Sequence, residues 1–255
     1  MHKSVSCDIS RIQFNQEQLE LLDTTRVPHH IAIIPDGNRR WARKNHTTVA
    51  QGHRAGVNNF LTVTKAARDL GVKTVTFYSF STENWLRDTL EIKALMWLME
   101  WYLCEQRQNM IDNGVRFCTI GNPALFSKSI QKALEETKMA TAHCEEIDMV
   151  IALNYGARDE IRRAFLALLT DCEANKVNKN EISEELIGRY LDTAQWPDPD
   201  LLIRTSGEQR LSNFLLWQTS YAELYIPQVL WPDYTPSHLL DAILHFQARK
   251  RRLGG

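Results

Sequence analysis

Apolar, β-like stretches alternate with stretches of helical period along almost the whole chain. Such alternation is typical of α/β proteins, in which helices cover both faces of a mostly parallel sheet. No segment rich in proline, glycine or serine divides the chain, so we predict an α/β fold with one domain and about six strands flanked by helices. The expected strands are residues 29–34, 74–80, 115–120, 149–154, 201–204 and 223–226, and the expected helices lie near 53–70, 90–113, 126–146, 157–175 and 236–252. Residues 1–24 are polar, and we predict for them a loosely attached leader segment.

Composition and charge exclude several classes of protein. The net charge of −1 gives no general attraction to nucleic acid or to an acidic membrane, so an anion site has to be built locally. The five cysteines are scattered and lack metal-ligand spacing, which favours a reducing compartment over a disulfide scaffold or a zinc site. No apolar run reaches membrane-spanning length, and Asp8, Arg11 and Glu17 interrupt the region where a signal peptide needs an apolar core. We therefore expect a cytoplasmic protein.

The segment 30–41 is the richest in chemistry. The continuous apolar run Ile31–Ile34 predicts a strand that is buried on both faces. Directly after it come Asp36, Gly37, Asn38 and two arginines, at the carboxyl end of a strand, where open α/β sheets bind ligands. A carboxylate beside guanidinium and free N–H groups suits a magnesium-bound phosphate ester. The alternative is an ordinary β-turn at Pro-Asp-Gly-Asn.

Three further clusters and the tail carry candidate ligands. Gly52-His53 is expected to open a helix whose N-terminal N–H groups would favour an anion, with a capping or core role for His53 as the alternative. Residues 80–87 combine hydroxyls, an acid, an arginine and a tryptophan after a strand, and otherwise form a plain loop. Residues 200–213 end a strand in Arg204 and Arg210 with small residues between, a phosphate-binding composition without Walker spacing, or else a solvated loop. The basic tail 249–255 is either functional or simply solvated.

The helix expected over 90–113 is apolar almost all round. Ile92, Leu95, Met96, Met99, Tyr102 and Leu103 follow the helical period, and Trp97, Leu98 and Trp101 widen the stripe. Such a helix is either buried between the sheet and its neighbours or lines an apolar cavity with one face. Methionines suit the second role because they repack around a flexible ligand.

Taken together, these motifs resemble those of the cis-prenyltransferases, and among them the bacterial undecaprenyl diphosphate synthases. The resemblance runs from about residue 29 to the C-terminus, so residues 25–255 would form the catalytic domain. Its markers are Asp36-Gly37-Asn38-x-Arg40-Trp41, Gly52-His53, Phe80-Ser81-x-Glu83-Asn84-Trp85-x-Arg87, Asn154-Tyr155-Gly156, Arg204-Thr205-x-Gly207-Glu208-x-Arg210-Leu211-Ser212-Asn213-Phe214, Glu223-Leu224-Tyr225 and Arg252-Leu253-Gly254.

The resemblance implies a reaction and a cofactor. An allylic diphosphate, typically farnesyl diphosphate, would be condensed with successive isopentenyl diphosphates to a long polyprenyl diphosphate, of undecaprenyl length by family default, for a cell-wall lipid carrier. Mg²⁺ would be held by Asp36, with Glu223 as a second acid on the metal side, and the growing chain would occupy a hydrophobic tunnel with Ser79, Leu95 and Met99 as candidate wall positions. Contact with the inner membrane face is expected only for product release.

The resemblance also implies roles for individual residues. Gly37, Asn38, Arg40, His53 and Arg87 would cradle the allylic diphosphate. Arg204, Arg210 and Ser212 would bind the diphosphate of isopentenyl diphosphate, and Ser81 and Asn84 would act with Asp36 in catalysis by orienting the substrate or assisting proton loss. Arg252 and Gly254 would reach the active site of a partner subunit, which implies a homodimer. Further substrate contacts are expected from Arg39, Trp41, Phe80, Thr82, Glu83, Trp85 and Leu211.

One position departs from the family pattern. Members usually carry an arginine four residues before the histidine of Gly-His, and this chain has Val49 there. Arg39, Arg43 or Arg54 would have to compensate.

Two rival functions are a non-catalytic partner subunit of a two-component prenyltransferase and a magnesium phosphohydrolase. Such a subunit would lack Asp36 and most of the arginines, and the hydrolase would need several clustered acids.

Overall fold

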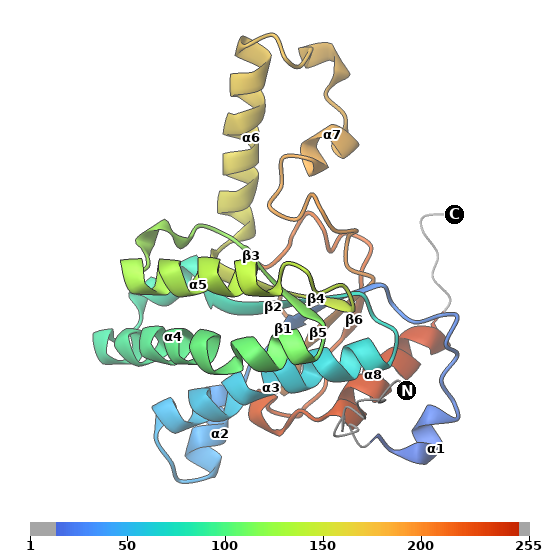
Figure 1. The fold of residues 1–255 in the computed structure, drawn as a ribbon. Coiled ribbons are helices and arrows are strands. Elements are labelled where there is room, and N and C mark those ends of the chain that lie inside the picture. The colour runs from blue at the N-terminus through green and yellow to red at the C-terminus, as the bar shows by residue number, and fades with distance from the viewer. Residues whose placement is uncertain (1–13, 250–255) are drawn as a thin grey trace, which may run out of the picture.

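A computed structural model describes residues 14–249 of the chain (Figure 1). Six strands form one sheet in the order β3-β4-β2-β1-β5-β6, and every neighbouring pair is parallel. The predicted α/β class is therefore confirmed. The strands are β1 (His30–Ile34), β2 (Thr74–Ser81), β3 (Val115–Ile120), β4 (Ile147–Tyr155), β5 (Leu201–Arg204) and β6 (Glu223–Tyr225).

Eight α-helices lie before, between and after these strands in the described part of the chain. They are α1 (Gln16–Leu19), α2 (Asn38–Lys44), α3 (Val49–Asp69), α4 (Thr89–Asp112), α5 (Lys128–Thr141), α6 (Ala157–Glu173), α7 (Glu184–Gly188) and α8 (Pro236–Ala248). Of the predicted leader, residues 14–24 are described. They contain α1 and are attached to α8, where the side chain of Gln247 both donates to the carbonyl of Asp23 (2.7 Å) and accepts from its N–H (3.2 Å).

The sheet is buried on both faces, as the continuous apolar run of β1 predicts. Ile31 and Ile33 face a core shared with α3, α4, α5 and α8, which lie on the same side of the sheet in Figure 1. Ala32 and Ile34 face a smaller core that includes Phe214. Because successive strand residues point to opposite faces, one five-residue strand contributes to both cores.

The strand order places β1 in the middle of the sheet. The chain runs from β1 to β2 on one side, and β5 returns on the other side of β1. The carboxyl ends of β1 and β5 therefore meet at a switch point in the strand order, where open α/β sheets bind their ligands. Asp36 follows β1, and Arg204 ends β5.

Helix α4 combines the two roles that its sequence left open. Leu98, Tyr102 and Leu103 are buried, the last two in the main core, whereas Trp97 on another face is exposed and stacks on Trp101. The same buried face lines a narrow apolar cavity together with Met99. The helix is therefore not buried all round.

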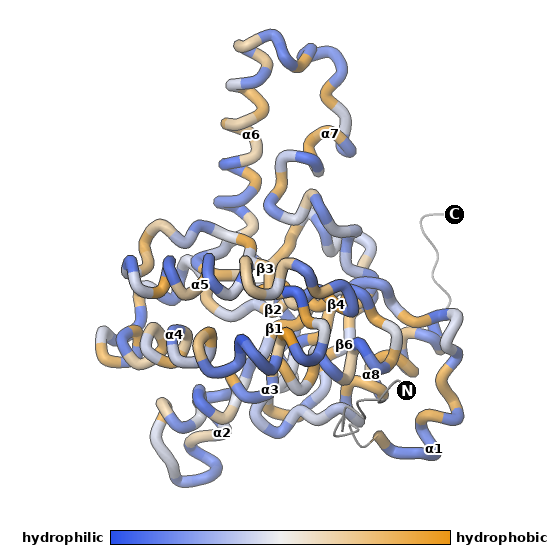
Figure 2. The backbone as a smooth tube through the Cα atoms, in the orientation of Figure 1, coloured by the Kyte–Doolittle hydropathy of each residue, from blue (hydrophilic) through white to orange (hydrophobic). Residues whose placement is uncertain are grey.

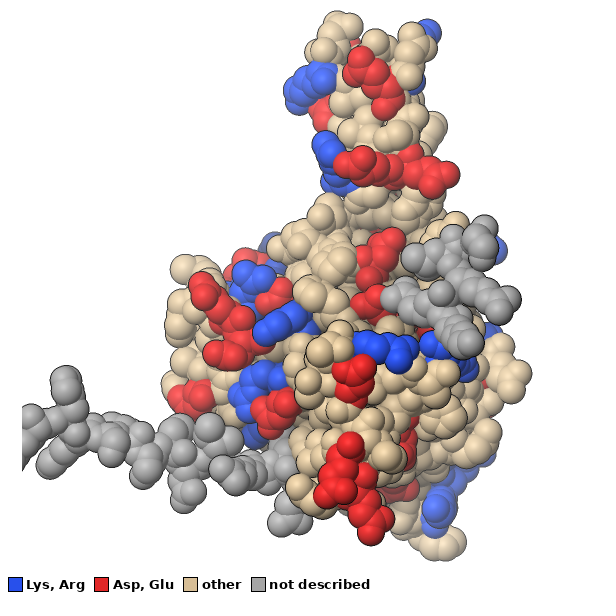
Figure 3. All heavy atoms as spheres, turned by 90° about the vertical axis from the view of Figure 1, so that its right-hand side faces the viewer, with Lys and Arg blue, Asp and Glu red and all other residues tan. Residues whose placement is uncertain are grey.

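Helix α6 projects from the body of the molecule together with α7 (Figure 1). Apolar and polar residues alternate along its projecting part (Figure 2), and Phe165, Leu166 and Leu169 are exposed there. On the face of the molecule drawn in Figure 3, acidic and basic side chains are intermixed, consistent with the near-zero net charge. None of the helices between residues 14 and 249 has both the length and the hydropathy to cross a membrane.

Candidate active site

Asp36 is fixed by its backbone between the ends of β1 and β5. Its N–H donates to the hydroxyl of Thr205 at 2.9 Å, and its carbonyl accepts from the same hydroxyl at 2.7 Å and from the N–H of Trp231 at 3.0 Å. The carboxylate accepts a hydrogen bond from Nη2 of Arg204 at 2.8 Å and remains 30% exposed. A held backbone with an accessible carboxylate is the arrangement expected of a ligand-binding acid.

Helix α2 begins beside Asp36 and lies unusually close to α3. Gly37, at φ +108°, makes the turn into α2. In α3, a Cβ at Gly52 would lie 2.5 Å from the carbonyl oxygen of Asn38, and one at Gly56 would lie 2.3 Å from its side-chain Oδ1. That Oδ1 is buried and has no hydrogen-bond partner among residues 14–249. The two glycines thus allow α2 to pack closely on α3, which keeps the polar residues of α2 beside Asp36.

The predicted role of Gly52-His53 as the start of a helix is wrong. Helix α3 begins at Val49, where Thr48 and Gln51 form a capping box, and the N–H of Gly52 already donates to the carbonyl of Thr48 at 3.1 Å. Gly52 therefore serves helix packing instead of anion binding through free N–H groups. His53 nevertheless reaches the site through its side chain, one turn into the helix.

Glu91, in the first turn of α4, collects three cationic side chains. Its carboxylate is held by the guanidinium of Arg39, by Nε2 of His53 at 3.2 Å and by Nη1 of Arg87 at 3.1 Å. Burial raises the pKa of Glu91, but the contact with Arg39 and those with Arg87 and His53 outweigh it, so its pKa lies below the usual value. The sequence analysis missed Glu91, although an acid four residues after Arg87 is a spacing at which the two side chains can form an ion pair.

The segment after β5 forms the opposite wall of the site. Arg204 is buried, with 5% of its side chain exposed, and its Nη1 donates to Oγ of Ser212 at 2.8 Å and to the carbonyl of Arg210. Its Nε is buried without a partner in the described structure. Arg40 of α2 reaches the same wall and donates to the carbonyl of Ser206 at 3.1 Å. Ser206 and Ser212 both have positive φ, so this wall keeps a backbone conformation that side-chain-bearing residues rarely adopt.

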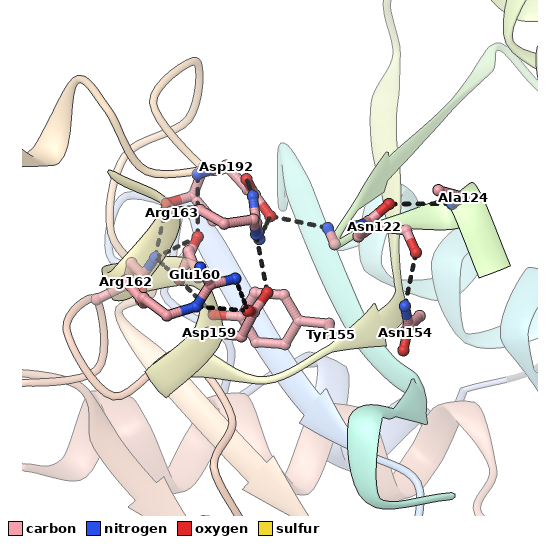
Figure 4. A network of polar contacts seen from close by, with 12 residues as sticks. Asn122, Ala124, Asn154, Tyr155, Asp159, Glu160, Arg162, Arg163 and Asp192 are labelled. Carbon is pink, nitrogen blue, oxygen red and sulfur yellow. Dashed lines mark hydrogen bonds and ion pairs between the residues drawn. The ribbon is translucent and has the colours of Figure 1, made fainter. Parts of the chain in front are cut away.

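Residues 81–86 are positioned by the Asn154-Tyr155-Gly156 motif. Asn84 accepts from the N–H of Ser81 at 3.1 Å, and both line the central cleft. The indole of Trp85 donates to Asn154 at 2.9 Å. In Figure 4, Asn154 turns toward Asn122, whose carbonyl accepts from its amide (2.8 Å).

A buried network lies behind that motif. Figure 4 shows the ring of Tyr155 directed at Glu160 of α6, to whose carboxylate its hydroxyl donates at 2.6 Å. Glu160 also accepts from the N–H of Asp192 at 3.0 Å, and Asp192 is paired with Arg163 at 2.7 Å. The network joins β4, α6 and residue 192, and so anchors the start of α6 behind the cleft.

Three connected hollows form the site. An arginine hollow of about 440 Å³ contains Arg39, Arg40, Arg43, Arg87 and Arg210. It shares Asp36, Asn38 and His53 with a central cleft of about 570 Å³, which Arg204 and Ser212 also line. The cleft in turn shares Val57, Phe60, Ser79 and Leu95 with the apolar cavity of about 60 Å³ under α4, which Met99 also lines. Cationic and apolar surfaces are therefore continuous, at opposite ends of one space.

Several predicted residues lie elsewhere. Phe80 is buried outside the central cleft but lines the apolar cavity, and its ring packs against that of Trp85 with the two ring centroids 5.0 Å apart. The indole of Trp41 donates to Asp233 at 2.6 Å. Thr82 lies against Gly156, and Leu211 packs on the smaller core. Glu83 does line the central cleft, where Asn213 donates to it at 3.0 Å.

Glu223 is not brought to Asp36 within one chain. It pairs with Leu201 at the start of β5, which in turn is level with Ile31. Asp36 lies beyond the other end of β1, about 16 Å further along the strand direction. The carboxylate of Glu223 instead pairs with Arg249 at 2.5 Å. Arg252 and Gly254 lie outside the described residues.

The residues around Asp36 fit a metal bound together with an anion better than a metal bound by protein alone. No group of three or more histidine, cysteine, aspartate or glutamate side chains in the described range could hold an ion. Mg²⁺ keeps few protein carboxylates and takes its remaining ligands from water and substrate phosphates. The partly exposed carboxylate of Asp36, which lines the arginine hollow together with Glu208, matches that donor set.

The comparisons with known proteins agree with this geometry. Residues 34–254 match the family model described as "Putative undecaprenyl diphosphate synthase". The chain is 44% identical to an isoprenyl transferase of Chlamydia caviae, over 95% of this chain and 99% of that protein. It is 45% identical to an isoprenyl transferase of Bacillus anthracis, over 90% and 89% of the two chains.

Two solved structures have the same fold. Lavandulyl diphosphate synthase from Lavandula x intermedia, in complex with dimethylallyl diphosphate, superposes with a TM-score of 0.87 at 33% identity, over 91% of this chain and all of that one. A probable undecaprenyl diphosphate synthase from Campylobacter jejuni gives a TM-score of 0.75 at 31% identity, over 89% and 99%.

Proposed function

This chain belongs to the undecaprenyl diphosphate synthase family of cis-prenyltransferases, and we propose that it elongates farnesyl diphosphate with successive isopentenyl diphosphates to a polyprenyl diphosphate of undecaprenyl length, for a cell-wall lipid carrier. The observation that carries this proposal is the continuity of the arginine hollow, the central cleft and the apolar cavity. A diphosphate with a hydrocarbon tail has the same two halves in the same order.

The two diphosphates would occupy different walls. The allylic diphosphate lies over the start of α2, where Asn38 and Arg40 face His53 and Arg87 across the arginine hollow. The diphosphate of isopentenyl diphosphate lies on the opposite wall, at Arg204, Arg210 and Ser212. Planar guanidinium groups bind diphosphate oxygens in pairs, which suits both positions. The buried, unpartnered Nε of Arg204 supports an additional acceptor there.

Asp36 would hold Mg²⁺ together with diphosphate oxygens. The ion would offset the negative charge that grows on the leaving diphosphate as the allylic C–O bond breaks. The cationic side chains around Asp36 add preorganised stabilisation of the same charge. Within one chain Glu223 lies at the opposite end of the strands from Asp36, so it could contribute to the metal site only if it occupied a different position.

Carbon–carbon bond formation is completed by loss of a proton from the isopentenyl unit. Ser81 and Asn84 line the cleft where that unit would lie, and the hydrogen bond from the backbone N–H of Ser81 fixes the side-chain amide of Asn84. They would orient the incoming unit and assist the proton transfer. The same wall carries the exposed carboxylate of Glu83.

The hydrocarbon chain would grow into the apolar cavity and enlarge it. Ser79, Leu95 and Met99, the wall positions expected from the sequence, all line this cavity. Each added five-carbon unit that leaves water for the cavity contributes roughly 3–4 kcal/mol of favourable transfer free energy, at about 0.8 kcal/mol per CH₂. Release of the finished chain would therefore be slow, and contact with a membrane surface or detergent would accelerate it.

The enzyme would act as a cytoplasmic homodimer. The exposed apolar residues Phe165, Leu166 and Leu169 of the projecting α6 support pairing with a second copy, because burying them removes apolar surface from water. The C-terminal Arg252 and Gly254 would then complete the partner's active site.

The test is incubation of the purified protein with farnesyl diphosphate, labelled isopentenyl diphosphate and Mg²⁺, with Asp36→Ala as the control. Chromatography should show long polyprenyl diphosphates from the wild type and none from the variant. A folded wild type that makes no product would instead indicate a non-catalytic partner subunit. Release of diphosphate from farnesyl diphosphate in water alone would indicate a phosphohydrolase.

A further inference from the structure

Position 49 supplies no charge to the site. Val49 is the first residue of α3 and is 38% exposed. It lines an outer, mostly apolar hollow of about 500 Å³ together with Leu90 and Trp97, and this hollow also touches His53 and Glu91. An arginine at position 49 would bring a charge to this hollow beside those two groups, whereas the valine adds only an apolar side chain.

The three arginines that could compensate differ in where their side chains lie. The guanidinium of Arg54 lies over the ring of Trp101, 5.3 Å from its centroid, on the side of the outer hollow. Arg43 lines the arginine hollow. Arg39 lines the same hollow and binds Glu91 through both Nε and Nη2.

The carboxylate of Glu91 marks an anion-binding position, because side chains from three different segments of the chain hold it there. Arg39 comes from α2, His53 from α3, and Arg87 from the segment before α4. Oxygens of a carboxylate and of a diphosphate accept hydrogen bonds from a guanidinium fork in the same way. An entering diphosphate, which carries more charge than Glu91, can therefore compete for the same donors.

We propose that Arg39 is a ligand of the allylic diphosphate and replaces the arginine that position 49 lacks, with Glu91 occupying its guanidinium until the diphosphate displaces it. This inference rests on the proposed function. Arg39 is 52% exposed at the edge of the hollow, so its side chain can turn from Glu91 to a ligand without disturbing the core. Arg54 lines the outer hollow and not the arginine hollow, so its guanidinium is not placed to reach the diphosphate.

Binding of farnesyl diphosphate with Mg²⁺ and without isopentenyl diphosphate tests the assignment by calorimetry. Arg39→Met should weaken binding about 10- to 100-fold, the effect of losing a hydrogen bond to a charged group. The Michaelis constant for isopentenyl diphosphate should stay within about twofold. Arg54→Met is the matched control and should bind as the wild type does.

Glu91→Gln separates a ligand from a positioning residue. If Arg39 only held Glu91 in place, removal of the negative charge would weaken binding as Arg39→Met does. Because we expect the carboxylate to compete with the diphosphate, Glu91→Gln should tighten binding. Weaker binding by Glu91→Gln, equal to that of Arg39→Met, would overturn the assignment.

The valine offers a rescue experiment. Val49→Arg should change binding less than about threefold in the wild type, where Arg39 already supplies the charge, yet restore most of the affinity lost in Arg39→Met. An Arg39→Met variant that binds normally, in an enzyme that still elongates, refutes only the role of Arg39. A wild type that elongates no allylic diphosphate refutes the proposed function itself.

Discussion

The close contact between α2 and α3 predicts that Gly52→Ala destabilises the protein although alanine favours helices. In a helix interior, alanine is preferred over glycine by up to about 1 kcal/mol. At Gly52, however, the new Cβ would lie 2.5 Å from the carbonyl oxygen of Asn38 and 3.0 Å from Cβ of Ala42. Overpacking costs about 1–3 kcal/mol, and the upper part of that range applies because the obstacle is backbone. We expect a net loss of about 1–2 kcal/mol.

Thermal unfolding measures this loss. For a chain of this size about 1 kcal/mol shifts Tm by about 2–4 °C, so Tm should fall by about 2–8 °C. Gly188→Ala is the control, because a Cβ there meets nothing within 4 Å, and its Tm should stay the same or rise. The displaced α2 carries Asn38 and Arg40, so the Michaelis constant for the allylic substrate should rise more than that for isopentenyl diphosphate. A Gly52→Ala protein as stable as the wild type would refute the packing argument.

Three further changes test other parts of the structure. Leu95→Trp, at the junction of the cleft and the apolar cavity, should shorten the products seen by chromatography, and products of unchanged length would contradict the tunnel. Burial raises the pKa of Glu160 above its ordinary value of 4.5. The native state therefore binds the proton of Glu160 more tightly than the unfolded state does. The wild type should lose stability relative to Glu160→Gln as pH rises through that raised pKa. Denaturant unfolding at about pH 4 and about pH 8 checks this, and a constant difference would contradict it. Leu169→Glu on α6 should shift the mass measured by light scattering toward that of a monomer, whereas an unchanged dimer would exclude α6 from the interface.

The sheet could be predicted from the sequence because its signal is local. Ile31–Ile34 is apolar at every position, which only a strand covered on both sides requires, and the two cores indeed divide these residues between them. The ends of such runs also gave the positions of Asp36 and Arg204, since parallel strands end at one edge. Their contact at 2.8 Å follows from that topology.

The start of α3 could not be predicted in the same way. Gly52 resembles a residue that begins a helix, yet Thr48 and Gln51 form the cap one turn earlier. The glycine is needed because Asn38, fourteen positions earlier in the chain, lies against it. A requirement set by a neighbouring helix leaves no trace in the local sequence pattern. The sequence analysis therefore singled out Gly52-His53 correctly but explained the glycine as the start of a helix instead of as a packing contact.

The arrangement of charges explains why the site needs its acids as well as its arginines. Arg204 is buried, and without Asp36 its charge would lack the carboxylate that stabilises it in a medium of low dielectric constant. Arg39 and Arg87 similarly share Glu91. Asp36 thus fixes Arg204 in position before any substrate is bound, which avoids reorganisation when negative charge develops, whereas Glu91 holds Arg39 only until a diphosphate displaces it. Asp36 and Glu91 differ in what happens next: the first can keep its place by holding Mg²⁺ against the diphosphate, whereas the second has only its charge to offer and must give way to it.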